Sequence, residues 1–454
     1  MPVTVVVLAA GQGKRMHSDL PKVLQPLAGR PLLSHVLKTA RALRPQAICV
    51  VYGHGGEQVR NAFSDTDLTW VHQAEQLGTG HAVSQALAHV PDEHRVVVLC
   101  GDVPLVRAET IERLLETPAG ELALATAVVP DATGYGRVIR NDRGEVVRIV
   151  EEKDARGSER AVTEINTGLL SFRAQELRRC LGKITNRNAQ GEYYLTDIVG
   201  LVAEQGTCVR GIVVDDAADV LGINDRVQLA AAERSLQRRI AEDLLRRGVT
   251  LADPARIDVR GQLTVGKDVF IDVGALFEGD VTLGDRVRIG AHAVITDCEL
   301  GDDCIVHPHT LMERSVAGPN CEIGPFARVR PGVALARQVK LGNFVEVKNS
   351  QIGDGSKVNH LSYVGDATIG AKVNVGAGTI TCNYDGAHKH RTVIGTGAFI
   401  GSGVMLIAPV EIGEDATIGA GSAISKDAPP GELTLERSKQ ITVAGWQRPT
   451  KQRK

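Results

Sequence analysis

With 454 residues, a formal net charge of −2 and only 3% aromatic residues, the sequence is long enough for two or three domains. It has no excess charge that would attract nucleic acid or a membrane surface. Its eight cysteines are scattered without a CxxC pair, which argues against a zinc site and favours a reducing compartment. No apolar run is long enough to span a bilayer, and the N-terminal run lacks the basic start of a signal peptide. We therefore expect a cytoplasmic protein with small-molecule partners.

The first half alternates apolar strands with helical segments. Strands are expected where Val and Leu cluster, in TVVVLAA, AICVVYG, LTWVHQ, RVVVLCGD and ELALATAVV. Between the first two, the segment PLLSHVLKTARAL places Leu33, Val36, Leu37 and Ala40 on one helical face. This alternation predicts a parallel, doubly wound α/β sheet, in which ligands bind beyond the carboxyl ends of the strands.

A glycine loop with cations follows the first strand. The stretch VVVLAAGQGKRMHSDLPKVL contains Gly11, Gly13, Lys14, Arg15 and Lys22. It fits neither the Walker pattern nor GxGxxG, because Met16 stands at the third glycine. Gly101 and Asp102 end a later strand, so they should reach the same pocket. Taken singly, the loop is consistent with a tight turn and Asp102 with a helix cap; together they indicate a phosphate site.

This combination resembles the nucleotidyltransferases that make nucleoside-diphosphate sugars. The resemblance rests on the GxGxR-M loop with its Pro-Lys pair and on EQLGTGHA, GDVPL, TGYGR and EINTG. The sequence differs at Lys14, where the family often has threonine, and at Cys100, where tyrosine is common. The resemblance implies attack of a sugar-1-phosphate on a nucleoside triphosphate, with pyrophosphate as leaving group and magnesium on oxygen ligands.

The same resemblance assigns individual residues. Arg15 and Lys22 would offset the triphosphate charge, and Asp102 and Asn224 would hold magnesium. Gln73 and the LGTG turn are elements that select uridine, so UTP is favoured. The implied substrate-binding set is Leu8, Ala9, Ala10, Gly11, Lys22, Gln73, Gly78, Thr79, Cys100, Gly101, Asp102, Gly136, Glu151, Asn166 and Asn224, of which Gln73, Gly78 and Thr79 contact uracil and Gly136, Glu151 and Asn166 hold the sugar.

A helix is predicted between two halves of different character. From Asp225 to Gly248 the pattern places Leu229, Leu236, Ile240 and Leu244 along one stripe and ends in glycine. The other face is strongly charged, and we interpret this helix as a connector. The predicted domains are a pyrophosphorylase domain over 1–226, a helical linker over 227–247 and an acetyltransferase domain over 248–454.

The second half repeats an aliphatic residue every six positions, often followed by glycine. This hexapeptide repeat predicts a parallel β-helix in which three hexapeptides make one coil and each aliphatic side chain points inward. It also explains the 49 glycines and the few aromatic residues. The residues expected inside are Leu283, Ile289, Ile295, Ile323, Val329, Leu341, Val347, Ile352, Val358, Val364, Ile369, Val375, Ile394, Ile400, Leu406, Ile412, Ile418 and Ile424.

Polar residues that face outward or interrupt the repeat are candidate site residues. Arg330 and Lys348 should stack on successive coils, where two cations repel unless an anion lies between them. The loop TITCNYDGAHKHR interrupts the repeat before Ile394, and His360 and Tyr363 project outward nearby. Surface charge and an inert histidine would explain each feature alone. Together they make His360 a candidate general base.

Over its whole length the chain is similar to the bacterial family of bifunctional N-acetylglucosamine-1-phosphate uridyltransferases and glucosamine-1-phosphate acetyltransferases. The motifs NFVEVK, GAGTITCNYDG and GPFARVRPG carry this resemblance. It implies left-handed coils, a homotrimer with acetyltransferase sites that span chains, and two reactions. Glucosamine-1-phosphate is acetylated by acetyl-CoA, and uridylyl transfer from UTP then gives UDP-N-acetylglucosamine for cell-wall and lipopolysaccharide precursors.

The resemblance also implies roles on the β-helix. His360 would deprotonate the sugar amine, Asn383 would orient the histidine, and the backbone of Tyr384 would lie near the developing oxyanion. Arg330, Lys348, Tyr363 and Asn374 would bind the sugar phosphate, and Ala377, Asn383, Tyr384, Ser402, Ala420 and Arg437 would contact acetyl-CoA. The alternative is a single-activity nucleotidyltransferase with a regulatory or scaffold tail. HLSY together with TITCNYDG disfavours it, because such a tail needs neither the base nor the loop.

Overall fold

The computed structural model describes residues 1–11, 13–53 and 55–449. The chain forms two compact units, Met1–Leu236 and Gln237–Lys454, and the division falls inside helix α7 (Arg226–Arg246). The predicted helix is therefore present, whereas the functional domain bounds stay a prediction. No helix in the described part of the chain is both long and apolar enough to cross a membrane.

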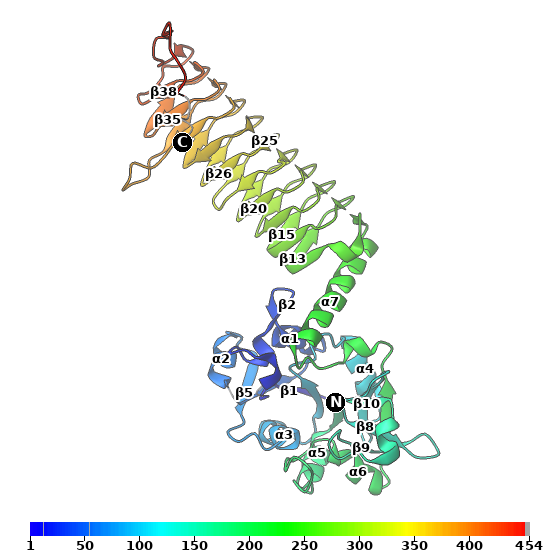
Figure 1. The fold of residues 1–454 in the computed structure, drawn as a ribbon. Helices are drawn as coiled ribbons and strands as arrows, with labels where there is room; N and C mark the ends of the chain where they lie inside the picture. Colours follow the sequence, from blue (N-terminus) through cyan, green and yellow to red (C-terminus); the bar gives the residue numbers. More distant parts are fainter. Residues whose placement is uncertain (12, 54, 450–454) are drawn as a thin grey trace, which may run out of the picture. The chain divides into compact units, whose positions relative to one another are not determined.

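The first unit is built on a nine-stranded sheet (Figure 1). Its central strands run in the order β11-β7-β10-β6-β1-β4-β5, and the hairpin β8-β9 is attached to β10. The strands are β1 (Val3–Leu8), β4 (Ala47–Tyr52), β5 (Leu68–His72), β6 (Arg95–Cys100), β7 (Leu122–Val128), β8 (Arg137–Arg140), β9 (Val146–Val150), β10 (Glu164–Arg173) and β11 (Val209–Val213). A separate short hairpin joins β2 (Pro26–Leu27) to β3 (Arg30–Pro31).

Every strand predicted from the Val and Leu clusters is present, but the sheet is not entirely parallel. β10 runs antiparallel to both neighbours, β6 and β7. After β7 the chain turns back through the hairpin β8-β9 and the 3₁₀ turn η3 (Gly157–Ala161) instead of a crossover helix. A strand that returns without such a crossover pairs antiparallel, so the expectation of a purely parallel sheet was wrong at this strand.

Helices cover both faces of this sheet, as the doubly wound class requires. Alternate residues of β1 point to opposite faces: Val5 and Val7 pack with α1 and α4, whereas Val6 packs with α3, α5 and α6. The helices are α1 (Leu32–Ala42), α2 (Gly56–Asn61), α3 (Thr79–Leu87), α4 (Ala108–Glu116), α5 (Ala174–Leu181) and α6 (Asp197–Glu204). The first turns of α7 also belong to this unit, where Leu229 and Leu236 pack on Leu27 and Leu32.

The second unit is a parallel β-helix whose short strands stack coil upon coil (Figure 1). One face is a sheet of β12 (Thr250–Leu251), β14 (Phe270–Ile271), β16 (Arg288–Ile289), β19 (Ile305–Val306), β22 (Glu322–Ile323), β25 (Lys340–Asn343), β28 (Lys357–His360), β31 (Asn374–Val375), β34 (Phe399–Ile400), β37 (Thr417–Ile418) and β39 (Leu433–Thr434). The other strands are β13 (Asp258–Val265), β15 (Leu276–Leu283), β17 (Val294–Thr296), β18 (Glu299–Leu300), β20 (Leu311–Glu313), β21 (Val316–Ala317), β23 (Arg328–Val329), β24 (Ala334–Leu335), β26 (Glu346–Lys348), β27 (Gln351–Ile352), β29 (Tyr363–Gly365), β30 (Ala367–Ile369), β32 (Ile380–Cys382), β33 (Thr392–Ile394), β35 (Met405–Ile407), β36 (Val410–Ile412) and β38 (Ala423–Ile424).

The core of this unit confirms the hexapeptide prediction. Every aliphatic residue expected inside is at most 3% exposed, and together they form one continuous core along the coils. The last turns of α7 close one end of that core, since Ala241 and Leu244 are buried with Val249 and Leu251. The core is therefore filled, and outward-facing side chains are left to carry function.

Candidate active sites

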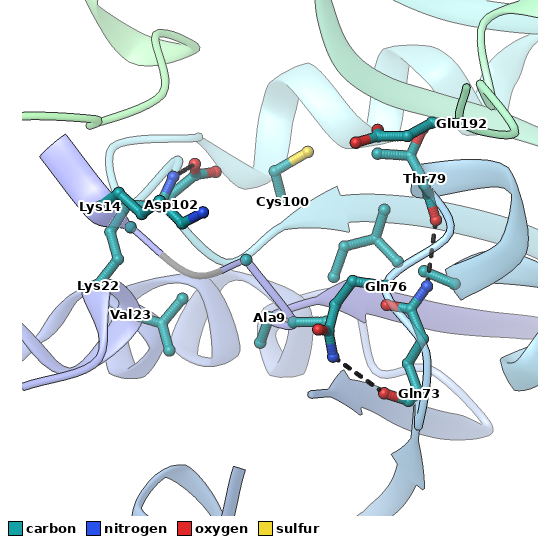
Figure 2. A pocket seen from close by; sticks show the side chains of 16 residues that line it. Ala9, Lys14, Lys22, Val23, Gln73, Gln76, Thr79, Cys100, Asp102 and Glu192 are labelled. Carbon is teal, nitrogen blue, oxygen red and sulfur yellow. Dashed lines mark hydrogen bonds and ion pairs between the residues drawn. The ribbon is translucent and has the colours of Figure 1, made fainter. Parts of the chain in front are cut away.

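A cavity of about 550 Å³ opens beyond the carboxyl ends of the strands of the first unit. In Figure 2, Lys22 and Asp102 lie at one end of it and Gln73 and Gln76 at the other, with Cys100 between them. The lining residues are Leu8, Ala9, Ala10, Gly11, Gly13, Lys14, Lys22, Val23, Gln73, Gln76, Gly78, Thr79, Ala82, Cys100, Asp102 and Glu192. The structure thus brings the glycine loop and the Gly-Asp pair to one pocket, as the sequence predicts.

The glycine loop is folded back on itself. Gly13 has φ +60°, and a Cβ there would lie 2.6 Å from the Cβ of Lys22, so only glycine fits this turn. The far side of the loop is held by Arg226, which donates to the Met16 carbonyl (3.2 Å) and to Gln25 Oε1 (2.8 Å). These contacts hold the loop in a position in which Lys22 lines the cavity.

Not every predicted residue lines the cavity directly. Arg15 is exposed on the 3₁₀ turn η1 (Lys14–Met16), and Lys14 lines the cavity in its place. Gly101 is buried behind the cavity, and its amide donates to the Leu8 carbonyl (2.9 Å). A Cβ at Gly101 would lie 3.1 Å from that oxygen, so glycine allows the ends of β1 and β6 to lie close together.

A cation already lies between the two residues predicted to bind magnesium. The Lys22 ammonium forms an ion pair with Asp102 and donates to Asn224 Oδ1 (3.2 Å). Asp102 caps no helix of the described residues, because the next helix, α4, begins six residues later at Ala108 and its N-cap is Arg107. A carboxylate and an amide oxygen that converge on one positive charge suit magnesium, which takes few protein ligands. No group of three or more His, Cys, Asp or Glu residues suited to a metal occurs among the described residues.

The opposite end of the cavity presents a buried amide. Gln73 is only 2% exposed, and its Nε2 is engaged with the Gly78 carbonyl (3.2 Å) and His81 Nδ1 (3.1 Å). Because the nitrogen is committed, the amide orientation is fixed and Oε1 is the atom that remains for a ligand. In the described part of the chain, no donor reaches that oxygen.

A segment that the sequence analysis missed supports this end. Gly78 has φ +112°, and a Cβ there would lie 2.6 Å from the Tyr193 carbonyl oxygen. The strand-like segment around Tyr193 accepts from Gly80 (2.8 Å) and donates to Leu77 (2.8 Å), and Leu195 donates to Thr79 Oγ1 (3.0 Å). Only tertiary packing brings this segment to the LGTG turn, so the sequence alone does not indicate it.

A second, smaller cavity of about 90 Å³ continues below Cys100. It contains Glu151 and Asn166, the predicted sugar residues, together with Leu8, Thr79, Cys100, Leu122, Leu124, Ile149, Gly168, Leu170, Leu195, Thr196 and Val199. Burial raises the pKa of Glu151, and Thr196 Oγ1 donates to its Oε1 (2.8 Å). Gly136 lies behind the carboxylate, since a Cβ there would lie 3.3 Å from both Glu151 oxygens.

Cys100 separates the two cavities and lines both. Burial raises the pKa of its thiol to about 12, and the charge of Asp102 adds to this effect. A thiol held neutral in this way is a poor nucleophile. Cys100 therefore lines the site without acting as a nucleophile.

On the β-helix, three cations gather at one corner. Arg330 and Lys348 follow paired positions of β23 and β26, so they stack on successive coils as predicted. The Lys389 side chain from the inserted loop lies beside Lys348 and lowers the pKa of Lys348. Arg330 donates to Glu346 Oε1 (2.8 Å), which raises the pKa of Arg330. The sequence analysis did not single out Lys389, although it lies in the loop that was singled out.

The inserted loop is anchored through Asn383. This side chain is 8% exposed, and its Nδ2 donates to Asp366 Oδ2 (2.5 Å) and lies 3.5 Å from the Tyr363 hydroxyl. Asn349 also donates to Asp366. Burial alone would raise the pKa of Asp366, but hydrogen bonds from Asn349 and Asn383 lower it. Beyond Asn383, a bridge between Tyr384 and Lys389 closes the loop and leaves Tyr384 exposed.

His360 ends β28 and is exposed, as expected for a residue that acts on a ligand. Its Nδ1 hydrogen-bonds to Asn343 Oδ1 (2.8 Å) on the preceding coil. Both residues line an open cavity of about 470 Å³ with Gly324, Pro325, Phe326, Gly342, Phe344 and Asn359. Within one chain, His360 is thus held by Asn343, and the orienting role assigned to Asn383 stays a prediction.

Four of the residues predicted to contact acetyl-CoA, Ala377, Ser402, Ala420 and Arg437, form a column on the following coils. The amide of Gly403 donates to the Ala377 carbonyl (2.7 Å), and that of Gly421 donates to the Ser402 carbonyl (2.8 Å). Ala420 is exposed just before Gly421, and a Cβ at Gly421 would lie 3.9 Å from Arg437 Cδ. Asn374 is half-buried in β31, the next strand after β28 on the same face.

Comparison with known proteins follows the same division of the chain. Residues 5–176 match the MobA-like NTP transferase domain, residues 259–341 the GMPPB C-terminal domain, and residues 391–426 the bacterial transferase hexapeptide (six repeats). The fold and the pocket therefore define a nucleotidyltransferase joined to a left-handed hexapeptide β-helix of the acyltransferase type.

Relatives that match over the full length identify the family. Bifunctional protein GlmU of Chromobacterium violaceum is 54% identical over 449 residues, which cover 99% of each chain. The proteins of the same name from Azoarcus sp. and Alkalilimnicola ehrlichii are 57% and 56% identical; these alignments cover 99% and 98% of this chain, and 100% and 96% of the relatives. The chain belongs to the GlmU family of bifunctional proteins. It is a UDP-N-acetylglucosamine diphosphorylase and a glucosamine-1-phosphate N-acetyltransferase.

Proposed function

We propose that the two reactions use the two sites described above. Uridylyl transfer takes place in the cavity beyond β1, and acetyl transfer takes place on the β-helix beside His360. The observation that carries this proposal is that each unit holds its own cluster of cations, Lys14 with Lys22 in one and Arg330, Lys348 and Lys389 in the other. Both sugar substrates are phosphate monoesters, so each site needs positive charge of its own.

In the uridyltransferase site, charge neutralisation is the main task. A phosphate oxygen of N-acetylglucosamine-1-phosphate attacks the α-phosphate of UTP, and pyrophosphate leaves. Asp102 and Asn224 would hold magnesium, which offsets the negative charge of the phosphates when bound. Lys22 then turns from Asp102 to the triphosphate, and the glycine amides allow the backbone to approach it.

Gln73 supports the choice of uracil. Its free Oε1 is an acceptor for the N3–H of uracil, whereas cytosine has an unprotonated N3 at that position. A buried acceptor left unpaired is costly, so this arrangement disfavours cytosine. In the smaller cavity, Glu151 and Asn166 are placed to accept and donate hydrogen bonds with sugar hydroxyls.

In the acetyltransferase site, His360 acts as the general base. The sugar amine attacks the thioester carbonyl carbon of acetyl-CoA, its proton passes to His360, and the C–S bond breaks to release the thiolate of CoA. Arg330, Lys348, Tyr363 and Lys389 hold the sugar phosphate. Asn374 joins this phosphate-binding set, and Ala377, Tyr384, Ser402, Ala420 and Arg437 form the wall along which acetyl-CoA lies.

We infer a homotrimer whose acetyltransferase sites span chains. Large apolar side chains are exposed on the β-helix, with Phe326 49%, Phe344 56%, Leu361 64% and Phe399 51% exposed. Exposed apolar patches of this kind mark protein interfaces, and the thioester needs enclosure from water. Sedimentation of the full chain tests this, because an acetyl-active monomer would contradict it. The cytoplasm, which supplies UTP and acetyl-CoA, is the proposed compartment.

The experiment that tests the two-site proposal offers the protein glucosamine-1-phosphate, acetyl-CoA, UTP and Mg²⁺ and measures UDP-N-acetylglucosamine. Omission of acetyl-CoA should stop product formation, and added N-acetylglucosamine-1-phosphate should restore it. His360→Ala should lower acetyl transfer by about 10²–10⁴-fold and leave uridylyl transfer intact. Near-normal acetyl transfer in that variant would refute the assignment of the base.

A further inference from the structure

We propose that Asn343 is a positioning residue for acetyl transfer, which fixes the tautomer and ring orientation of His360. This inference rests on the proposed role of His360 as the base. It adds a residue that the motif-based assignments do not include, and it follows from the geometry of two neighbouring coils.

The contact is built into the stacking of the coils. Asn343 ends β25 and His360 ends β28, and these two strands pair in parallel with Asn343 directly opposite His360. Asn343 Oδ1 lies 2.8 Å from His360 Nδ1. Just before this pair, a Cβ at Gly342 would overlap the backbone of Asn359, so glycine permits the two strand ends to approach closely. The Leu361 amide also donates to the Asn343 carbonyl (3.1 Å), which ties the corners together.

The chemistry of the contact decides which ring nitrogen is basic. An amide oxygen can only accept, so the proton of a neutral His360 ring must be on Nδ1. Nε2 then carries the lone pair that takes the proton from the sugar amine. When a base is held in the wrong tautomer, most of its catalytic benefit is lost even though the site keeps its shape.

The other candidate for this role is engaged elsewhere in the chain. Asn383 donates to Asp366 and lies near Tyr363, which places it with the phosphate-binding corner. Among the residues that the structure describes, Asn343 is the one whose side chain bonds to the His360 ring. Asn343 therefore orients the base, and Asn383 anchors the inserted loop.

The test compares three variants of the full chain. Asn343→Leu removes the acceptor at nearly constant size, Asn343→Asp keeps an oxygen at that position, and Gln351→Leu replaces an exposed amide on β27, away from the His360 cavity. Acetyl transfer is measured as kcat and KM from pH 5 to 9. Thermal unfolding of the same preparations, followed by circular dichroism, reports on folding of the β-helix, and uridylyl transfer reports on the first unit.

For Asn343→Leu we expect kcat to fall about 10–100-fold, with KM for glucosamine-1-phosphate little changed. Asn343→Asp should restore most of kcat and shift the acidic limb of the rate profile up by about one pH unit, because a carboxylate stabilises the protonated ring. Gln351→Leu should resemble the parent.

Full kcat in Asn343→Leu, or an unshifted acidic limb in Asn343→Asp, would overturn the inference. His360→Ala distinguishes a failure of the proposed base from a failure of its positioning by Asn343. If that variant is inactive in acetyl transfer while Asn343→Leu is normal, the base stands and its positioning by Asn343 fails. If His360→Ala keeps its activity, the proposed base itself is wrong.

Discussion

The two units present functional groups in opposite ways. In the first unit, loops from distant parts of the chain close around cavities, so that Lys22, Asp102 and Asn224 meet although about 200 residues separate the first from the last. In the second unit, outward side chains lie one above another on successive coils, and neighbours such as Asn343 and His360 come from consecutive coils.

This difference determines how each site excludes water. The proposed uridyltransferase cavity is lined by residues of one chain, with Gln73 buried and Glu151 half-buried, so we expect one chain to supply all its parts. The wall beside His360 is open, and His360 and Tyr384 are exposed. We therefore expect the proposed acetyltransferase site to depend on a neighbouring surface in a way that the first site does not. Three further predictions separate the two sites, in order of decreasing effect.

The largest effect is expected for Asp102→Ala, which tests whether the two reactions use separate sites. The variant loses one of the two oxygen ligands proposed for magnesium, so uridylyl transfer should fall by about 10³-fold or more. Acetyl transfer should be unchanged, because Asp102 belongs to the first unit. Separate assays of the two half-reactions check this. If EDTA stopped both reactions equally, the two-site assignment would fail.

Lys22→Met tests whether the Lys22 ammonium competes with a metal ion in the first site. Its ammonium lies between the two proposed metal ligands, so it competes with a metal ion as long as no nucleotide is bound. The variant should bind Mn²⁺ severalfold more tightly without nucleotide, while uridylyl transfer falls about 10²-fold. Electron paramagnetic resonance of free Mn²⁺ measures the affinity. Lys14→Met is the matched control and should leave Mn²⁺ affinity unchanged; an equal increase there would contradict the model.

The smallest effect is expected from Lys389→Ala. Lys389 lowers the pKa of Lys348, so Lys348 loses its charge at a lower pH than an ordinary lysine. In the parent, KM for glucosamine-1-phosphate should therefore rise as the pH increases through that lowered pKa. In the variant, the neutral-pH KM should rise a few-fold, because one cation is lost, and the alkaline increase should move to higher pH. An alkaline limb that stays in place would show that the two lysines do not interact.

Much of this molecule is predictable from sequence because its signals are periodic. The six-residue repeat identified the buried residues of the β-helix, and the spacing of Arg330 and Lys348 gave their stacking. The antiparallel direction of β10 was not predictable, since strand and helix alternation says nothing of a hairpin between two strands. Tyr193 was missed because only tertiary packing brings it to Gly78.

The contact between Asn343 and His360 could have been predicted from the sequence. Asn343 precedes His360 by 17 residues (360 − 343), one coil of the β-helix, so it falls at the same corner. The repeat was used to find inward residues and was not applied to the outward ones. In a fold of this kind, each candidate catalytic residue points to a partner one coil before it and another one coil after it.

The stacking of coils also restricts how such a chain can change in evolution. A single deletion inside a strand would turn every later side chain of that strand to the opposite face. The corners absorb a change of one residue, since coils of 18 residues (Leu276 opposite Val294) and of 17 residues (Thr282 opposite Glu299) both keep the parallel pairing. An extra segment at a corner leaves the register intact, as the insertion that carries Asn383 and Lys389 shows: β30 on one side of it still pairs in register with β33 on the other. New sequence, and with it new binding surface, is therefore expected to accumulate at the corners, while whole coils are gained or lost as units.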